Sequence, residues 1–308
     1  MAYRLKRDES VIRGLKRVVR EEIESARDRL SGRQKISRHK AIHEARKSIK
    51  KVRALLRLAG EEMAGLEADE NQRLRDVARR LSHYRDAFVM VETFDGLRKK
   101  FPKESAGKMR SIRAALVKKR DAISREEDAR IVLDHAAAAL DLAAKRVKRW
   151  KLAANGFAAI SPGLEKTYRA GRKALSCVQQ DSRAEDYHEL RKKVKDHWYH
   201  LRLLEGLWSD VMIAYEKSLK DLETWLGDDH NLVVLREQIT VQPESYGDKK
   251  EVGLLIDLIE KYQQELRKQS VSLAERVYEE KPREFRRRMK SLWDTWRTQP
   301  KLESPTAA

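Results

Sequence analysis

Apolar residues recur at helical spacing along nearly the whole chain. They lie in segments rich in Ala, Leu, Glu, Lys and Arg, which favour helices, and no alternating strand pattern interrupts them. Long helices joined by short loops favour antiparallel bundles, so we expect an all-α protein followed by a flexible tail over 301–308. The predicted helices cover 10–30, 37–60, 70–94, 105–124, 126–149, 163–180, 184–206, 211–227, 229–240, 249–279 and 282–297.

The chain also repeats itself at a constant offset of 145 residues. The run His43–Lys50 corresponds to His188–Lys195, and eight of the sixteen residues at 43–58 are identical to their counterparts. This self-similarity predicts two copies of one helical unit, over 1–150 and 151–300. The copies either pack as halves of one compact body or stand as separate domains.

The predicted helix over 37–60 carries two stripes. Apolar residues from Ile42 to Ala59 recur every three or four positions and form the seam that faces the core. A second stripe at the same spacing is basic, and it consists of His39, His43, Arg46, Lys50, Arg53 and Arg57. Each residue turns the helix by about 100°, so the basic stripe flanks the core seam. The second copy repeats it with His188, Arg191, Lys195 and Arg202, and with Trp198 in place of Arg53.

Acidic residues are almost missing from this helix. Residues 38–57 contain eight Lys or Arg and one acid, Glu44, although like charges three or four positions apart repel each other. One interpretation is a solvated face, or a stripe matched by acids on a neighbouring helix. The other is an anion-binding face, which the recurrence in both copies favours. The net charge of +19 and the isoelectric point near 9.9 also point to a polyanion: nucleic acid, an anionic membrane surface or a phosphate polymer.

Several classes of protein are disfavoured. Cys177 is the only cysteine, so no internal disulfide can form, and the longest uncharged stretch, 152–164, is too short to span a bilayer. The charged N-terminus lacks the apolar core of a signal peptide. We therefore expect a cytoplasmic protein with no membrane span.

These motifs resemble those of the CHAD family, whose name stands for conserved histidine α-helical domain. The similarity rests on His-Glu-x-Arg-Lys-x-x-Lys, which begins at His43 and again at His188, and on the Leu-Arg-Leu runs at 56–58 and 201–203. It extends to the pattern Leu-x-x-x-Arg-Asp-x-x-Val over 81–89. The resemblance covers most of the chain.

The resemblance, over about 10–298, implies two four-helix bundles related by a pseudo-twofold axis, with basic residues facing a central channel or cleft. It implies non-catalytic binding of long-chain inorganic polyphosphate, for which phosphate or sulfate would be a mimic, and association with polyphosphate granules. We expect no cofactor and no metal, and polyphosphate-metabolising enzymes are candidate partners. The implied binding residues are Arg27, His43, Arg46, Lys47, Lys50, Arg53, Arg57, Arg85, Arg172, His188, Arg191, Lys192, Lys195, Arg202 and His230. Because Trp198 and the pair His230-Asn231 depart from the first copy, we expect the first copy to contribute more.

Three alternatives remain. Nucleic acid would use the same charges and could stack on aromatic residues, although core packing is the favoured interpretation for Tyr199 and Trp208. A phosphate-converting enzyme is disfavoured, because the chain has no Glu-x-Glu-x-Lys motif and no glycine-rich phosphate loop. His39 and His43 have metal-ligand spacing, but their basic neighbours would repel a cation. Membrane-surface binding ranks lower, because the apolar seam is already needed for the core of the bundle and is not left to enter a membrane.

Overall fold

The fold consists of helices, as the apolar spacing predicts. The structure is a computed structural model that describes residues 3–125 and 129–299, and within these ranges it contains no strand. The all-α fold class is therefore confirmed, while the predicted tail at 301–308 lies outside the described residues. The helices are α1 (Val11–Leu30), α2 (Arg38–Ala59), α3 (Leu66–Arg80), α4 (Ser82–Lys100), α5 (Pro102–Ser105), α6 (Arg110–Ser124), α7 (Ala129–Val147), α8 (Ser161–Asp181), α9 (Ala184–Leu203), α10 (Ser209–Val241), α11 (Lys249–Val277) and α12 (Pro282–Thr298).

Side-chain caps fix the starts of three long helices. The Ser10 hydroxyl accepts a hydrogen bond from the backbone N–H of Arg13 at the start of α1. At the start of α2, the Ser37 hydroxyl accepts one from the backbone N–H of Lys40. The Asp248 carboxylate accepts from the N–H of Glu251 at 2.8 Å in the first turn of α11. Each cap satisfies a backbone donor that has no partner within the helix.

Two predicted boundaries are wrong, in opposite senses. The helix expected over 70–94 is two helices, α3 and α4, which change direction at the fully buried Leu81. The break expected near Gly227 is absent, because α10 runs through it as one helix of 33 residues. A Cβ at Gly227 would lie 3.4 Å from the guanidinium of Arg191, an ordinary van der Waals contact, and the helix continues through this glycine without a turn.

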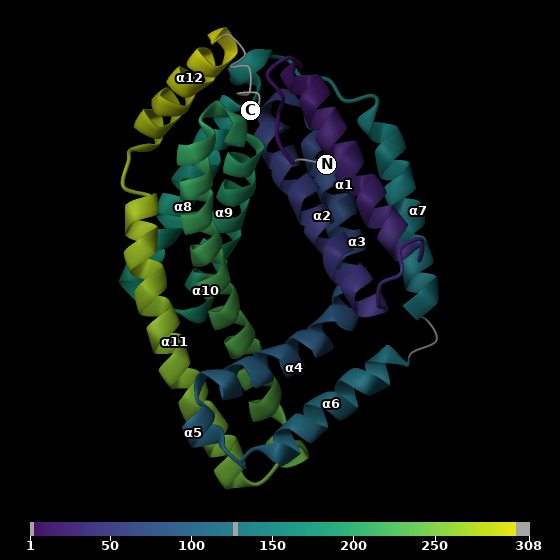
Figure 1. Ribbon diagram of the computed structural model, residues 1–308, viewed down its shortest axis with the longest axis vertical. Helices are drawn as coiled ribbons and strands as arrows, with labels where there is room; N and C mark the ends of the chain where they lie inside the picture. The colour runs from purple at the N-terminus through teal and green to yellow at the C-terminus, as the bar shows by residue number, and fades with distance from the viewer. Residues whose placement is uncertain (1–2, 126–128, 300–308) are drawn as a thin grey trace, which may run out of the picture.

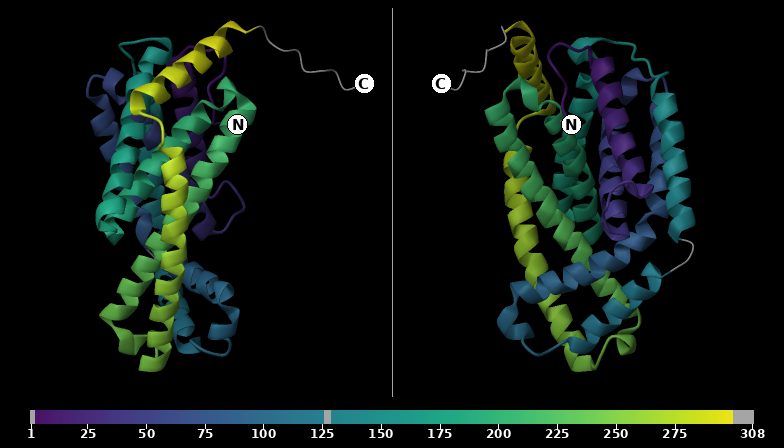
Figure 2. Two further views of the ribbon diagram at one scale, coloured as in Figure 1. Left: turned by 90° about the vertical axis from the view of Figure 1, so that its left-hand side faces the viewer. Right: turned by 45° about the vertical axis from the view of Figure 1, so that its right-hand side comes forward.

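Two groups of helices stand side by side and diverge from each other (Figure 1). One group contains α1, α2, α3 and α7, and the other contains α8, α9 and the upper parts of α10 and α11. Helix α2 packs against both α8 and α9 and so joins the groups. Helix α4 crosses below the space between them, and with α6 it packs on the far ends of α10 and α11 to close the lower end (Figure 2).

The chain has two apolar cores. The larger one joins the two upper groups through residues such as Ile42 of α2 and Tyr168 of α8. The smaller one lies at the lower end, where Phe94 of α4 meets Leu235 of α10 and Ile259 of α11. Each core therefore draws residues from both predicted repeats, which fits one compact body. Shifted by 145 residues, α2 coincides with α9 to within one residue at each end, while the repeat as such stays a prediction.

None of the described helices combines the length and the apolar character that a transmembrane segment needs.

Candidate functional site

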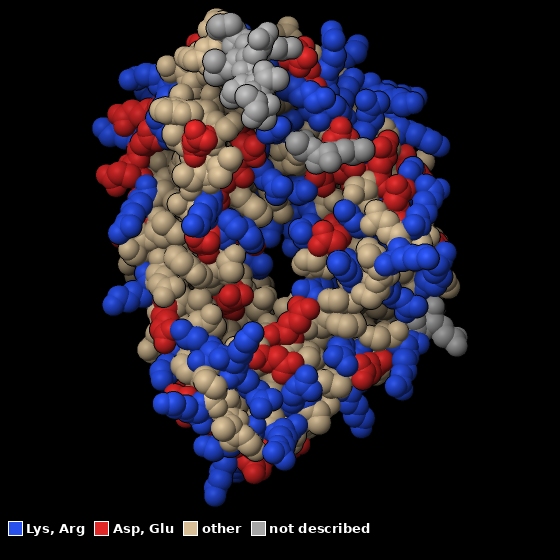
Figure 3. Space-filling model, in the orientation of Figure 1, with Lys and Arg blue, Asp and Glu red and all other residues tan. Residues whose placement is uncertain are grey.

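A cleft of about 620 Å³ lies between the two groups of helices, lined by residues of α2, α4, α9 and α10. Nine Lys or Arg and three Asp or Glu line it, so the cleft carries an excess of six positive charges before its histidines are counted. The space-filling view shows a hollow near the middle of the molecule, with Lys and Arg side chains on several sides of it (Figure 3). Such a concentration of like charge favours an anionic ligand.

Most of the residues singled out from the sequence meet in this cleft. Nine of the fifteen line it: His43, Arg46, Lys47, Lys50, Arg85, Arg191, Lys195, Arg202 and His230. The other six are not part of its lining: Arg27, Arg53, Arg57, Arg172, His188 and Lys192.

The wall formed by α2 presents Arg46 and Lys50. Arg46 donates a hydrogen bond to the backbone carbonyl of Ala78, which lies in the last turn of α3 and has no partner within that helix. Across the described ranges 3–125 and 129–299, Lys50 has neither an ion pair nor a hydrogen bond. Burial, and then the positive charges of Lys195 and Arg46, lower the pKa of Lys50 well below its usual value. The α2 wall thus holds a lysine without a direct ion pair, and the nearest opposite charges that act on it are those of Asp86 and Glu223, which also line the cleft.

The opposite wall presents Arg191 and Lys195 from α9, together with Lys220 and Glu223 from α10. The Lys195 ammonium donates to Oε1 of Glu223 at 2.6 Å, and Lys220 donates to Oε2 at 2.9 Å. Burial would raise the pKa of Glu223, but these two lysines outweigh it and hold that pKa at about 2. An acid on a neighbouring helix therefore does match part of the second basic stripe, as one of the open interpretations held.

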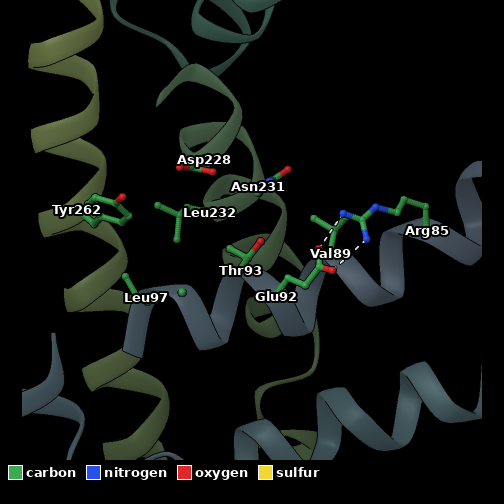
Figure 4. Close-up of a pocket in the computed structure, with 10 residues that line it drawn as sticks. Arg85, Val89, Glu92, Thr93, Leu97, Asp228, Asn231, Leu232 and Tyr262 are labelled. Carbon is green, nitrogen blue, oxygen red and sulfur yellow. Dashed lines mark hydrogen bonds and ion pairs between the residues drawn. The ribbon is translucent and has the colours of Figure 1, made fainter. Parts of the chain in front are cut away.

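The lower end of the cleft is formed by Arg85 on α4. Its guanidinium makes a two-pronged contact with Glu92, at 3.2 and 2.7 Å, and Nη1 lies 2.7 Å from Nε2 of His39. A neighbouring pocket of about 330 Å³ shares Arg85 and Asp228 with the cleft and runs on between α4, α10 and α11 to Tyr262 (Figure 4). The Arg85–Glu92 pair stands where the two spaces meet.

Histidines from both halves lie at the cleft. His43 and His230 line it, and the ring of His188 packs behind that of His230 with their centroids 4.2 Å apart. Burial, followed by the charges of His188 and Arg191, lowers the pKa of His230 to about 4. Burial, followed by Arg85, also lowers the pKa of His43. At neutral pH both rings are neutral, and each can donate one hydrogen bond to a ligand.

Two arginines of the first stripe lie away from the cleft because other helices approach them. Arg57 forms a two-pronged pair with Asp196 of α9 and a 3.2 Å hydrogen bond to Asn71 of α3. Arg53 donates to the same Asn71 oxygen at 2.8 Å, and burial, followed by Arg57, lowers its pKa to about 10. Both residues tie α2 to its neighbours.

The remaining three basic residues have partners outside the cleft. Arg27 pairs with Asp28 and with Asp141 of α7, and Lys192 pairs with Glu189 one turn away on α9. Arg172 donates to three successive backbone carbonyls, 278–280, where α11 ends. These contacts bind each of the three residues to other parts of the protein and not to the cleft.

Lys51 and Lys220 line the cleft outside the two stripes and were not among the residues predicted from the sequence. Lys220 could have been found from its position three residues before Glu223, because this spacing favours an ion pair on one face of a helix. Trp198 also lines the cleft, with Lys220 5.0 Å and Arg202 6.0 Å from the ring centroid. Trp208 is 55% exposed, so its expected core position is wrong: it precedes α10 in an extended conformation that turns it outward.

In the described part of the chain, no three His, Cys, Asp or Glu side chains gather in a way that could hold a metal ion. His39 instead stacks on Phe88, with centroids 3.9 Å apart, and contacts Arg85.

Fold and site together define an all-helical protein with a cationic cleft between two groups of helices. The CHAD domain model matches residues 17–240, and the chain therefore belongs to the CHAD family. Its structure is similar to the crystal structure of the CHAD domain from the plant Ricinus communis, with a TM-score of 0.60 and 17% sequence identity over 91% of this chain and 95% of that one. At this identity the likeness shows the shared fold. A comparison with curated proteins gave no match.

Proposed function

We propose that the protein binds long-chain inorganic polyphosphate in the cleft between α2, α4, α9 and α10, without converting it. The observation that carries this proposal is the excess of six positive charges on the lining, which includes Lys50, a lysine with no ion pair among the described residues. A polymer with a negative charge on every unit, and no bases to recognise, needs closely spaced donors at fixed positions.

The side chains of the cleft suit phosphate oxygens. Arg46 and Arg191 offer planar forks, while Lys50 and Lys195 offer compact charges. Helices hold these groups in place before the ligand arrives, which lowers the ordering cost of binding. The repulsion among them in the free protein is relieved when a polyanion enters.

Calorimetric titration with long-chain polyphosphate at several salt concentrations tests this proposal. If the ligand neutralises the net charge of the cleft, the logarithm of the affinity should fall with the logarithm of the salt concentration with a slope of about −4, at about 0.7 per charge. Reversing Arg46 and Arg191 to glutamate should weaken binding while the helical circular dichroism is retained. Reversing Lys192, which lies outside the cleft, is the matched control for each single reversal. A salt-independent affinity would contradict the proposal.

Nucleic acid is the second candidate, favoured by Trp198, whose ring lies in the cleft among cations and could stack on a base. A competition experiment at matched phosphate concentration separates the two. Polyphosphate should displace single-stranded nucleic acid far better than nucleic acid displaces polyphosphate. The reverse order would favour nucleic acid as the ligand.

The binding is proposed to be non-catalytic, which is supported by the state of Glu223, one of the three acidic residues on the lining, whose carboxylate is held between two lysines. Incubation with polyphosphate and Mg²⁺ or Mn²⁺ should release no phosphate. We further propose a cytoplasmic location on polyphosphate granules, with polyphosphate-metabolising enzymes as partners. A fluorescent fusion should colocalise with granules and become diffuse when the cell makes no polyphosphate.

A further inference from the structure

One carboxylate lies within the cationic wall formed by α9 and α10. Glu223 is 5% exposed, and its two oxygens are held by Lys195 at 2.6 Å and Lys220 at 2.9 Å. Nη2 of Arg191 lies 3.8 Å from Oε1 of the same group. Three cations thus surround one carboxylate, much as they would surround a phosphate group.

The α2 wall has no carboxylate gripped in this way. Asp86 of α4 lines the cleft on that side, and the charges of Arg46 and Lys50 act on it, but burial outweighs them and raises its pKa. At the 145-residue offset the counterpart of Glu223 is Ala78, which offers only its backbone carbonyl, to Arg46. The counterpart of Lys195 is Lys50, which has no partner among the described residues. The two walls therefore differ in one respect that matters for an anion: the lysines of one wall are in direct contact with a carboxylate, Glu223, whereas Lys50 on the other wall has no direct contact with Asp86.

We propose that Glu223 occupies a phosphate position between Lys195 and Lys220, so that a small phosphate binds only at the Lys50 wall and a polymer must displace Glu223 to span the cleft. This inference rests on the polyphosphate-binding function proposed above. Glu223 is then a residue that determines which anions engage the second wall.

The physical reason is competition between a tethered and a free anion. Glu223 is held beside its lysines by the helix, so a free monophosphate or pyrophosphate meets a site that is already satisfied. A polymer anchored on Lys50 and Arg46 holds its next phosphates close to the second wall. These phosphates therefore have a high effective concentration there, as the tethered Glu223 carboxylate does. Displacement leaves no lysine unpaired, because phosphate oxygens replace the carboxylate.

The test compares wild type, Glu223→Gln and the control Glu189→Gln by calorimetry with pyrophosphate and with long-chain polyphosphate. Glu189 is half-exposed on α9, pairs with Lys192 outside the cleft, and its change alters the net charge equally. Glu223→Gln should bind pyrophosphate about tenfold more tightly, because one competing charge-assisted contact is removed. Its salt slope for the polymer should steepen by about 0.7 to 1.4, since one or two more cations need the ligand.

A double-mutant cycle with Lys220→Gln locates the effect. Loss of Lys220 should weaken pyrophosphate binding about tenfold more in the Glu223→Gln background than in the wild-type background. Glu223→Ala, which reproduces the Ala78 side of the cleft, serves as the second variant if the glutamine variant does not fold.

The possible failures are distinct. If wild type binds long-chain polyphosphate but Glu223→Gln and Glu189→Gln change pyrophosphate affinity alike, Glu223 has no such part and the inference is wrong. If wild type binds no polyphosphate at all, the proposed function fails, and the inference fails with it.

Discussion

Lys50 gives a prediction in which stability and binding move in opposite directions. Its ammonium group lies among Lys195, Arg46 and Arg191 with no partner in the described structure, and its pKa is lowered well below the usual value, by burial first. A charge held in this way destabilises the folded protein. Lys50→Met keeps the length of the side chain and removes the charge, so it should raise the free energy of unfolding by about 1–3 kcal/mol at pH 7.

The same change should weaken polyphosphate binding. A charge-assisted hydrogen bond to phosphate is worth about 1.5–3 kcal/mol, which corresponds to a loss of roughly 10- to 150-fold in affinity. The salt slope should become shallower by about 0.7, because one fewer counterion is released. The stability gain should shrink as the pH rises toward 10.5, since the lysine of the unfolded chain then loses its charge as well.

Urea unfolding followed by circular dichroism measures the stability change, and calorimetry measures the affinity. Lys192→Met is the matched control: Lys192 is exposed, pairs with Glu189 and lies outside the cleft, so its removal should change stability by no more than about 0.5 kcal/mol. The reasoning is refuted if Lys50→Met lowers stability and leaves the affinity for polyphosphate unchanged.

Three further predictions concern pH and packing. His197 and His200 are fully buried, and burial lowers their pKa values to about 3 and about 4. Between pH 6.5 and pH 5 only the unfolded state gains these protons, so urea unfolding should show a free energy of unfolding lower by about 2 kcal/mol per histidine at pH 5 than at pH 8. In His197→Phe the part of this loss that is due to His197 should disappear. Polyphosphate affinity should rise as the pH falls from about 6.5 toward 4, because bound phosphate favours protonated His230, whose pKa in the free protein is about 4. Calorimetry should find a flatter rise in His230→Gln. A rise identical to that of wild type would show that the His230 ring does not contact the ligand. Asp196→Asn should lower the free energy of unfolding, measured with urea, by about 1–3 kcal/mol, because it weakens the ion pair with Arg57. A large change in polyphosphate affinity in this variant would show that Arg57 contacts the ligand.

The apolar spacing predicted the helices well and their ends less well. Leu81 is a good helix former, and yet the chain bends there because its side chain is taken into the core between α3 and α4. Gly227 followed by two aspartates favours a break, and yet α10 continues, with Leu226 on one side of the glycine buried in the larger core and Leu232 on the other side buried in the smaller one. In both places tertiary packing overrides local preference.

The basic stripe of α2 was predicted as one continuous binding surface, but it is divided between two roles. Its middle part, from His43 to Lys50, lines the cleft, while Arg57 near the end of α2 reaches Asp196, which lies 139 positions away in the sequence. Spacing along one helix cannot reveal which distant helix brings an acid. The same limit applies to Glu223, whose place between two lysines becomes visible only once α9 and α10 are packed together.

A crystal structure of the protein with bound polyphosphate tests the central claim most directly. We expect a chain of phosphates in the cleft, within hydrogen-bonding distance of Lys50 and Arg46 on one wall and of Arg191 and Lys195 on the other. Phosphate density found only on the outer faces of the bundles, with the cleft filled by water, would contradict the account.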